Sequence, residues 1–192
     1  MTYNKRNTEH SVISLFSGCG GLDLGFQNAG FKIVFSNDFD KDIWETYEKN
    51  FGSKIDGRPI QNIKSEEIPA AEGVIGGPPC QSWSLAGSMR GFEDPRGKLL
   101  YEYIRIIKDK KPLFFVLENV PGLISKAHNK SFQEVIEKLE DIKTLEELGY
   151  NVAWDVLNAK DYGCPESLIR YRSLLAFSKV FVPYSNDFSQ SY

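Results

Sequence analysis

Short apolar runs alternate with amphipathic stretches along most of the chain. Runs rich in Val, Ile, Leu and Phe predict strands at residues 11–16, 31–38, 72–77, 112–120, 151–159 and 173–177. Between these runs, apolar residues recur at helical spacing and predict helices at residues 22–28, 40–51, 94–110 and 131–148. The alternation predicts a doubly wound α/β fold, with a mostly parallel sheet and helices on both of its faces.

Chemically distinctive residues follow the ends of several predicted strands. They are the glycines from Gly18 to Gly21, the acidic Asp38, the loop that carries Cys80, and Glu118. The carboxyl ends of parallel strands meet at one edge of the sheet, where ligands of such folds bind. The sequence therefore predicts a binding site at this edge.

The first two features are typical of a nucleotide-like ligand. Glycines between a strand and a helix let a ligand approach the backbone, but the spacing here is not G-x-G-x-x-G. The alternative is a tight turn that needs positive φ angles. Asp38 is placed to bind ribose hydroxyls and Phe39 to stack on an adenine. Alternatively, Asp38 or Asp40 caps the next helix, and both roles hold if Asp40 is the cap.

Cys80 and Glu118 are the candidates for chemistry. Cys80 follows two glycines and two prolines, which restrict the loop and leave room for a flat substrate. The alternative is a cysteine packed in the core. Glu118 ends an apolar run, where desolvation would favour the protonated form that donates a proton to a ring nitrogen. The alternative is a helix cap. No histidine lies near either residue in the sequence, so a Cys-His hydrolase lacks a base.

Composition narrows the class of protein. The chain has 192 residues, a net charge of −3, three cysteines and two histidines without metal-binding spacing, so neither a disulfide framework nor a metal site is expected. No apolar run approaches the ~20 residues of a membrane span, and the polar N-terminus does not resemble a signal peptide. We expect a cytoplasmic protein with a flexible start at 1–10, a domain at 11–180 and a frayed tail at 181–192.

Taken together and in order, several motifs resemble the DNA cytosine-5 methyltransferases. "FSGCGGLDLGF" is similar to the family's cofactor motif, "GGPPCQSWS" to its nucleophile motif and "ENV" to its proton-donor motif. "DPRGKLLYEYIRI" is similar to the helix between the last two. The resemblance covers residues 12–177 and is greatest to bacterial restriction–modification enzymes, with GGCC as a hypothetical recognition site.

The resemblance implies transfer of a methyl group from S-adenosylmethionine to C5 of a cytosine flipped out of double-stranded DNA. Cys80 would add to C6 and Glu118 would protonate N3, with Arg170 as a further catalytic residue. Phe16 and Phe39 would flank the adenine, and Asp38 would hold the ribose. The full cofactor set implied by the resemblance is Phe16, Ser17, Gly18, Cys19, Gly20, Gly21, Leu22, Asp38, Phe39, Ile60, Pro79 and Leu99.

The sequence departs from the family pattern in three places. Pro59 stands where the family usually has an acidic residue that contacts the adenine amino group. In the family's Gln-x-Arg-x-Arg motif, Glu166 and Leu168 replace the first two residues and only Arg170 fits, although Arg172 lies nearby. The chain also ends before the expected target-recognition domain. Three hypotheses follow: a catalytic half that is completed by a second chain or cut from a longer gene, a remnant that binds cofactor only, or a nucleotide-binding or adaptor module without catalytic activity.

Overall fold

A computed structural model describes residues 10–79, 98–119, 151–163 and 171–178 of the chain. These residues form a six-stranded sheet whose strands are β1 (Ser11–Leu15), β2 (Lys32–Asn37), β3 (Gly73–Gly76), β4 (Phe114–Asn119), β5 (Asn151–Asn158) and β6 (Tyr171–Ser178). The helices described are α1 (Gly21–Asn28), α2 (Lys41–Phe51) and α3 (Lys98–Lys110), with short 3-10 helices η1 (Ile60–Asn62), η2 (Ser65–Glu67) and η7 (Ala159–Tyr162). The six predicted strands and three of the predicted helices are confirmed. The helix predicted at 131–148 lies outside the described residues, as does the predicted start of α3 at Asp94 and Pro95.

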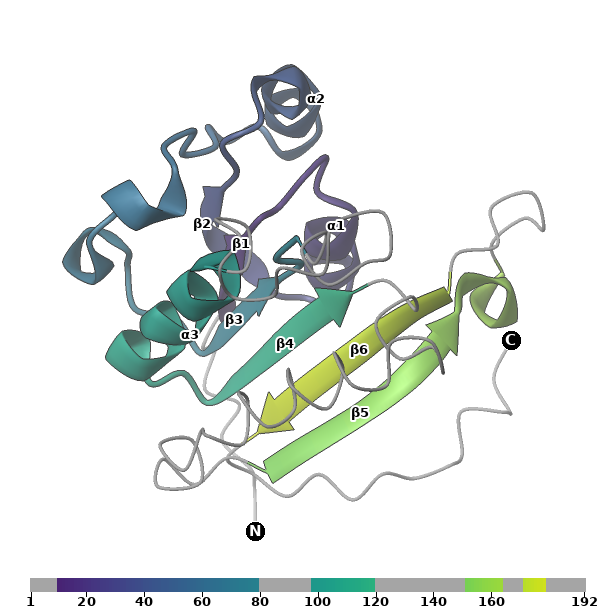
Figure 1. Cartoon of the computed structure of the whole chain (residues 1–192). Helices are drawn as coiled ribbons and strands as arrows, with labels where there is room; N and C mark the ends of the chain where they lie inside the picture. Colours follow the sequence, from purple (N-terminus) through teal and green to yellow (C-terminus); the bar gives the residue numbers. More distant parts are fainter. Residues whose placement is uncertain (1–9, 80–97, 120–150, 164–170, 179–192) are drawn as a thin grey trace, which may run out of the picture.

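The strand order is β2-β1-β3-β4-β6-β5, and the first four strands are parallel (Figure 1). β6 pairs antiparallel with both β4 and β5, so β5 runs in the same direction as β4. The sheet is therefore mostly parallel, as predicted. In consequence, β1, β2, β3, β4 and β5 all direct their carboxyl ends to the same edge.

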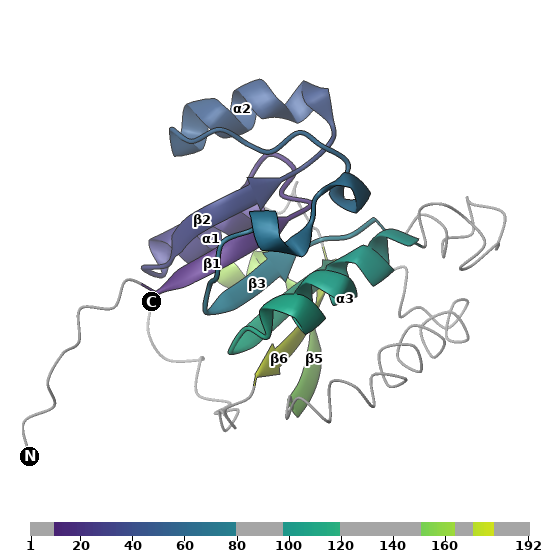
Figure 2. The same ribbon diagram turned by 90° about the vertical axis from the view of Figure 1, so that its left-hand side faces the viewer.

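Helices cover both faces of the sheet, because successive side chains of each strand point to opposite sides. On one face, α3, η1 and η2 pack on an apolar cluster that includes Ile13, Val74 and Phe115. On the other face, Val12, Ile75 and Val116 pack with the Phe26 side chain of α1. Figure 2 shows α3 on the near face of the sheet and α1 behind it.

Two side chains of α3 attach this helix to distant parts of the chain. The Tyr103 hydroxyl is completely buried and donates to the Val116 carbonyl at 2.8 Å, with the Val74 carbonyl at 3.2 Å. The Arg105 guanidinium donates to the Ile63 carbonyl at 3.0 Å and to the Ser65 hydroxyl at 2.7 Å. The Tyr103 bonds hold α3 on β3 and β4, and the Arg105 bonds hold the irregular connection between α2 and β3 against α3. No helix in the described part of the chain is long and apolar enough to span a membrane.

Gly76 permits the close approach of β3 to β1 at the edge where the ligand is expected. A Cβ atom at this position would lie 2.3 Å from the Leu15 carbonyl oxygen, and backbone cannot move away cheaply. We predict that Gly76→Ala lowers the free energy of unfolding by about 1–3 kcal/mol, the usual cost of overpacking. Urea denaturation with a linear fit measures the change.

The matched control is Gly25→Ala in α1, where an added Cβ meets nothing within 4 Å. This change is expected to raise stability by about 0.5–1 kcal/mol, because alanine loses less backbone entropy in a helix. Equal effects of the two substitutions would contradict the close packing at Gly76.

Candidate active site

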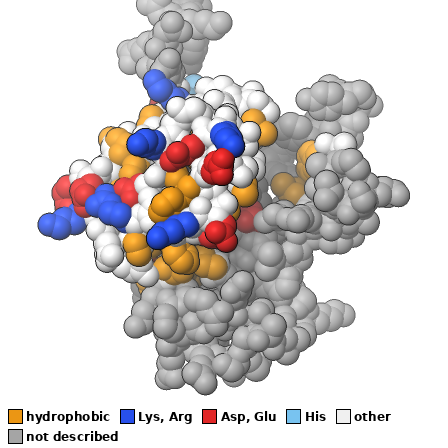
Figure 3. All heavy atoms as spheres, turned by 90° about the horizontal axis from the view of Figure 1, so that it is seen from above, with side chains coloured by type: hydrophobic (Ala, Val, Ile, Leu, Met, Phe, Trp, Pro, Cys, Tyr) orange, Lys and Arg blue, Asp and Glu red, His pale blue; other side chains and the backbone are white. Residues whose placement is uncertain are grey.

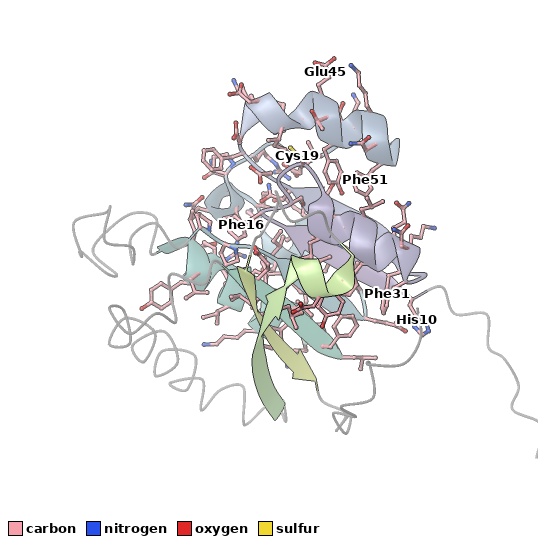
Figure 4. The ribbon with its side chains drawn as sticks, turned by 90° about the vertical axis from the view of Figure 1, so that its right-hand side faces the viewer. His10, Phe16, Cys19, Phe31, Glu45 and Phe51 are labelled. Carbon is pink, nitrogen blue, oxygen red and sulfur yellow. The ribbon has the colours of Figure 1, made fainter. Side chains whose placement is uncertain are left out.

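A cleft with a volume of about 790 Å³ lies at the carboxyl ends of the strands. This is within the usual range for a small-molecule site. Figure 4 shows two of its residues, Phe16 and Cys19, in the connection that leads from β1 to α1. The residues that line the cleft are Ser14, Phe16, Ser17, Gly18, Cys19, Gly21, Leu22, Asp23, Gly76, Gly77, Glu118, Leu157 and Tyr162. The edge of the sheet where we predicted a site therefore contains a cleft. Among the described residues, the glycine cluster and Glu118 both line this cleft.

The glycine turn between β1 and α1 combines a constrained backbone with an open side. Gly18 and Gly20 have φ angles of 52° and 85°, which strain side-chain-bearing residues. A Cβ on Gly20 would also lie 2.1 Å from a ring carbon of Phe51, whereas Gly18 and Gly21 face open space. Both readings of the glycine cluster are thus supported: the turn needs positive φ angles, and it leaves room beside the backbone.

Phe16 is a bulky residue with a φ of 55°, a conformation that costs free energy in a residue of this kind. The aromatic ring is partly buried against the core and also lines the cleft. The strained backbone at the end of β1 thus accompanies an aromatic wall of the cleft.

Asp38 is held beside the glycine turn by backbone N–H groups. Its Oδ2 accepts from the Gly18 N–H and its Oδ1 from the Asp40 N–H, both at 2.9 Å. Asp40 caps α2 by accepting from the Asp42 N–H at 3.1 Å, which confirms the predicted cap. Phe39 is 58% exposed, so its ring is available for stacking. Because a carboxylate accepts several bonds, Asp38 retains capacity for a ligand hydroxyl.

Glu118 lies next to the start of the loop that leads to Cys80. Its Oε2 is 2.7 Å from the position that a Cβ on Gly77 would occupy, so the absence of a side chain at Gly77 makes room for the carboxyl group. Pro78 is buried and Pro79 partly buried in the loop that follows. Cys80 and Arg170 lie outside the described residues, so their roles stay predictions.

Asp23 is a buried carboxyl group that sequence reasoning missed. It accepts from the Ser14 hydroxyl and from the Tyr47 hydroxyl, each at 2.6 Å. Desolvation raises the pKa of Asp23 and outweighs the lowering effect of these hydrogen bonds. Burial and the adjacent Asp23 also raise the pKa of Tyr47. The sequence signal for this group was that Ser14 and Asp23 are polar residues at core positions, one in a predicted strand and the other in a predicted amphipathic helix.

The remaining predicted residues occupy different surroundings. Ile60 is 2% exposed in the core under α3, and Leu99 packs against the same cluster, so neither side chain lines the cleft. Leu157 and Tyr162 do line it, although sequence reasoning did not select them. Leu157 is paired in register with Arg172 of β6.

Charges around the described site are mixed in sign. Figure 3 shows Lys and Arg interspersed with Asp and Glu on the face that carries α2. Next to it, Arg58 bridges Asp56 and Glu67 at 2.8 Å each and lowers the pKa of both carboxyl groups. The face that carries α2 therefore does not form a basic surface for a nucleic-acid backbone.

The described residues contain no cluster of His, Cys, Asp and Glu that could hold a metal ion.

The chain matches the family model of the C-5 cytosine-specific DNA methylases over residues 10–176, and it belongs to this family. It is 52% identical over 178 residues to the Type II methyltransferase M.FnuDI of Fusobacterium nucleatum, covering 90% of this chain and 50% of that protein. It is 56% identical over 155 residues to the Type II methyltransferase M.MthTI of Methanothermobacter thermautotrophicus, covering 81% and 45%. The chain thus spans about half the length of these relatives.

A solved structure shows the same fold. The Entamoeba histolytica methyltransferase EhMeth superposes with a TM-score of 0.73 and 23% sequence identity, over 94% of this chain and 55% of that chain. The resemblance stated from the motifs and the predicted α/β class are therefore confirmed.

The contrast between two adjacent glycines tests the geometry of the turn. Gly20→Ala is expected to lower the free energy of unfolding by about 2–4 kcal/mol, because left-handed strain adds to overpacking against Phe51. Gly21→Ala is expected to leave stability unchanged within about 0.5 kcal/mol, since its Cβ meets nothing within 4 Å. Thermal or urea unfolding of both variants provides the measurement. A Gly20→Ala variant as stable as the parent would contradict the packing of α2 on the turn.

Proposed function

We propose that this chain is the cofactor-binding and catalytic part of a DNA cytosine-5 methyltransferase of the restriction–modification type. The observation that carries the proposal is that the glycine turn and Glu118 line one ligand-sized cleft, while Asp38, which is not a lining residue, is bonded to the turn through the Gly18 N–H. Family membership suggests the reaction class, and the cleft supports the proposal because the glycine turn and Glu118 both line it.

The residues of the cleft, together with Asp38 and Phe39 just after β2, fit S-adenosylmethionine. Gly18 and Gly21 leave space beside the backbone for the amino-acid end of the cofactor. Asp38 offers a carboxylate to the ribose hydroxyls, while Phe16 and the exposed Phe39 offer aromatic surface to the adenine. When bound, the cofactor supplies an electrophilic methyl group on a sulfonium centre.

Glu118 and Cys80 would activate the cytosine together. C5 of cytosine is a weak nucleophile while the ring is aromatic. The Cys80 thiolate would add to C6 and the Glu118 carboxyl group would deliver a proton to N3, which leaves C5 enamine-like. After C5 has taken the methyl group, a solvent base would remove the C5 proton, the thiolate would leave C6, and N3 would return its proton to Glu118, which restores the ring. The base has to leave the duplex to reach the cleft.

The chain spans about half the length of the two relatives named above. We propose that base-edge contacts come from a target-recognition part that the matched half does not contain, in a second chain or a further segment. The mixed charges on the α2 face are consistent with DNA binding elsewhere.

Methyl transfer tests the mechanism directly. With DNA and a complementing recognition part, tritium from labelled S-adenosylmethionine should enter cytosine, and Cys80→Ala should abolish incorporation because the C6 adduct cannot form. Glu118→Gln should lower the rate by about 10²-fold or more, the scale of a lost general acid. Cys164→Ala, a matched loss of a thiol, should retain activity. Incorporation that survives Cys80→Ala would overturn the mechanism.

Gly77→Ala separates the position of Glu118 from its chemistry. The added methyl group would meet the flexible end of the Glu118 side chain, so stability should change by less than about 1 kcal/mol. Turnover should nevertheless fall by about tenfold or more, because the carboxyl group is displaced from its place beside the loop. An unchanged kcat in a correctly folded Gly77→Ala protein would show that this proximity does not matter.

A second candidate function is cofactor binding without turnover, which Pro59, Glu166 and Leu168 favour as departures from the family pattern. Calorimetry with S-adenosylmethionine distinguishes the two. Binding without methyl transfer, with every candidate recognition part supplied, would support the second candidate.

A further inference from the structure

We infer that Asp23 is a positioning residue, whose buried carboxyl group joins the glycine turn to α2 and so sets the shape of the cofactor site. The identity of the ligand in this inference rests on the proposed function. The effect on the turn itself does not, because it follows from contacts within the chain.

The carboxyl group lies at the centre of a chain of hydroxyl groups from three elements. Its Oδ2 accepts from Tyr47 of α2 and its Oδ1 from Ser14 of β1, each at 2.6 Å. The Ser14 Oγ also lies 2.9 Å from the Ser17 Oγ. Since the Ser14 proton is used on Asp23, a bond between the two hydroxyls is donated by Ser17, whose Oγ also lies 3.3 Å from the Ser14 carbonyl and 3.4 Å from the Asn37 carbonyl. A continuous path of hydrogen bonds therefore runs from Tyr47 of α2 through Asp23 and Ser14 to Ser17, which precedes Gly18 in the turn.

The same turn touches α2 and β2 at other points. The Ser17 N–H donates to the Asn37 carbonyl at 3.1 Å, and the Gly18 N–H donates to Asp38 at 2.9 Å. Gly20 packs against the rings of Phe51 and Tyr47, which stack on each other at 4.4 Å between their centres. Figure 4 shows the Phe51 side chain of α2 directed toward the part of the molecule that carries Cys19. The adenosine end and the methionine end of the site are thus carried by elements that meet at the Asp23 network.

Stability alone does not account for a carboxyl group at this place. Asp23 is completely buried, and the side chains that bond to it in the described part of the chain are two neutral hydroxyls rather than a cation. Burying such a group costs free energy that a well-packed apolar side chain would not. What an apolar side chain cannot do is orient two hydroxyls in fixed directions, and that orientation is the property the turn needs.

The test compares two buried tyrosines. Tyr47→Phe and Asp23→Asn each disturb the network, whereas Tyr103→Phe removes an equally buried hydroxyl whose partners are strand carbonyls under α3. Amide hydrogen exchange is followed by NMR at Gly20, which bonds to the Ser17 carbonyl at 2.9 Å, and at Ile13 in the centre of β1. Calorimetry measures the affinity for S-adenosylmethionine.

Tyr47→Phe and Asp23→Asn should each accelerate exchange at Gly20 by about tenfold relative to Ile13, the scale of one lost buried hydrogen bond. They should also weaken cofactor binding by about tenfold. Tyr103→Phe should lower global stability, yet it should change neither the ratio of Gly20 to Ile13 exchange nor the affinity for S-adenosylmethionine. The double variant should lose little more affinity than either single one, because both act through the same bond.

The outcomes separate the inference from the proposed function. If the wild-type chain binds S-adenosylmethionine but Gly20 exchange and affinity respond equally to all three substitutions, the inference is overturned and the proposed function stands. If the wild-type chain binds no S-adenosylmethionine, the proposed function fails. The ratio of Gly20 to Ile13 exchange then still decides whether Asp23 holds the turn.

Discussion

The direction of the central strands is the constraint on which the site depends. β1, β3 and β4 lie side by side and parallel, so three separate stretches of sequence end at one edge of the sheet. Gly76 allows β3 to approach the backbone of β1 so closely that there is no space for a methyl group. Without this alignment, the glycine turn and Glu118 would not line a common cleft.

The antiparallel strand β6 has a consequence for the same edge. It lies between β4 and β5 and lets β5 run parallel to β4, so the end of β5 also reaches the cleft through Leu157. Tyr162 in η7, which follows directly, adds a second wall residue. The cleft is therefore bounded by the ends of β1, β3 and β4 and also by β5 and η7.

Two features beside the cleft lower the stability of the fold. Phe16 adopts a left-handed conformation, and Asp23 is a desolvated carboxyl group whose pKa is raised. Phe16 lies in the connection between β1 and α1, Asp23 lies in the first turn of α1, and both line the cleft. The apolar clusters on the two faces of the sheet supply the stability that these groups reduce.

The sequence by itself determined the elements and the family. Apolar periodicity predicted the strands and three described helices, since it reports which side chains are buried, and the Asp40 cap followed from local hydrogen bonding. The motifs around the glycines and Cys80 identified the reaction class. Only the tertiary structure decided that Asp23, Ser14 and Tyr47 meet, that Ile60 is buried in the core, and that Tyr162 borders the cleft. Those contacts join residues distant in the sequence, and their distances depend on how helices pack on the sheet, which no local pattern encodes.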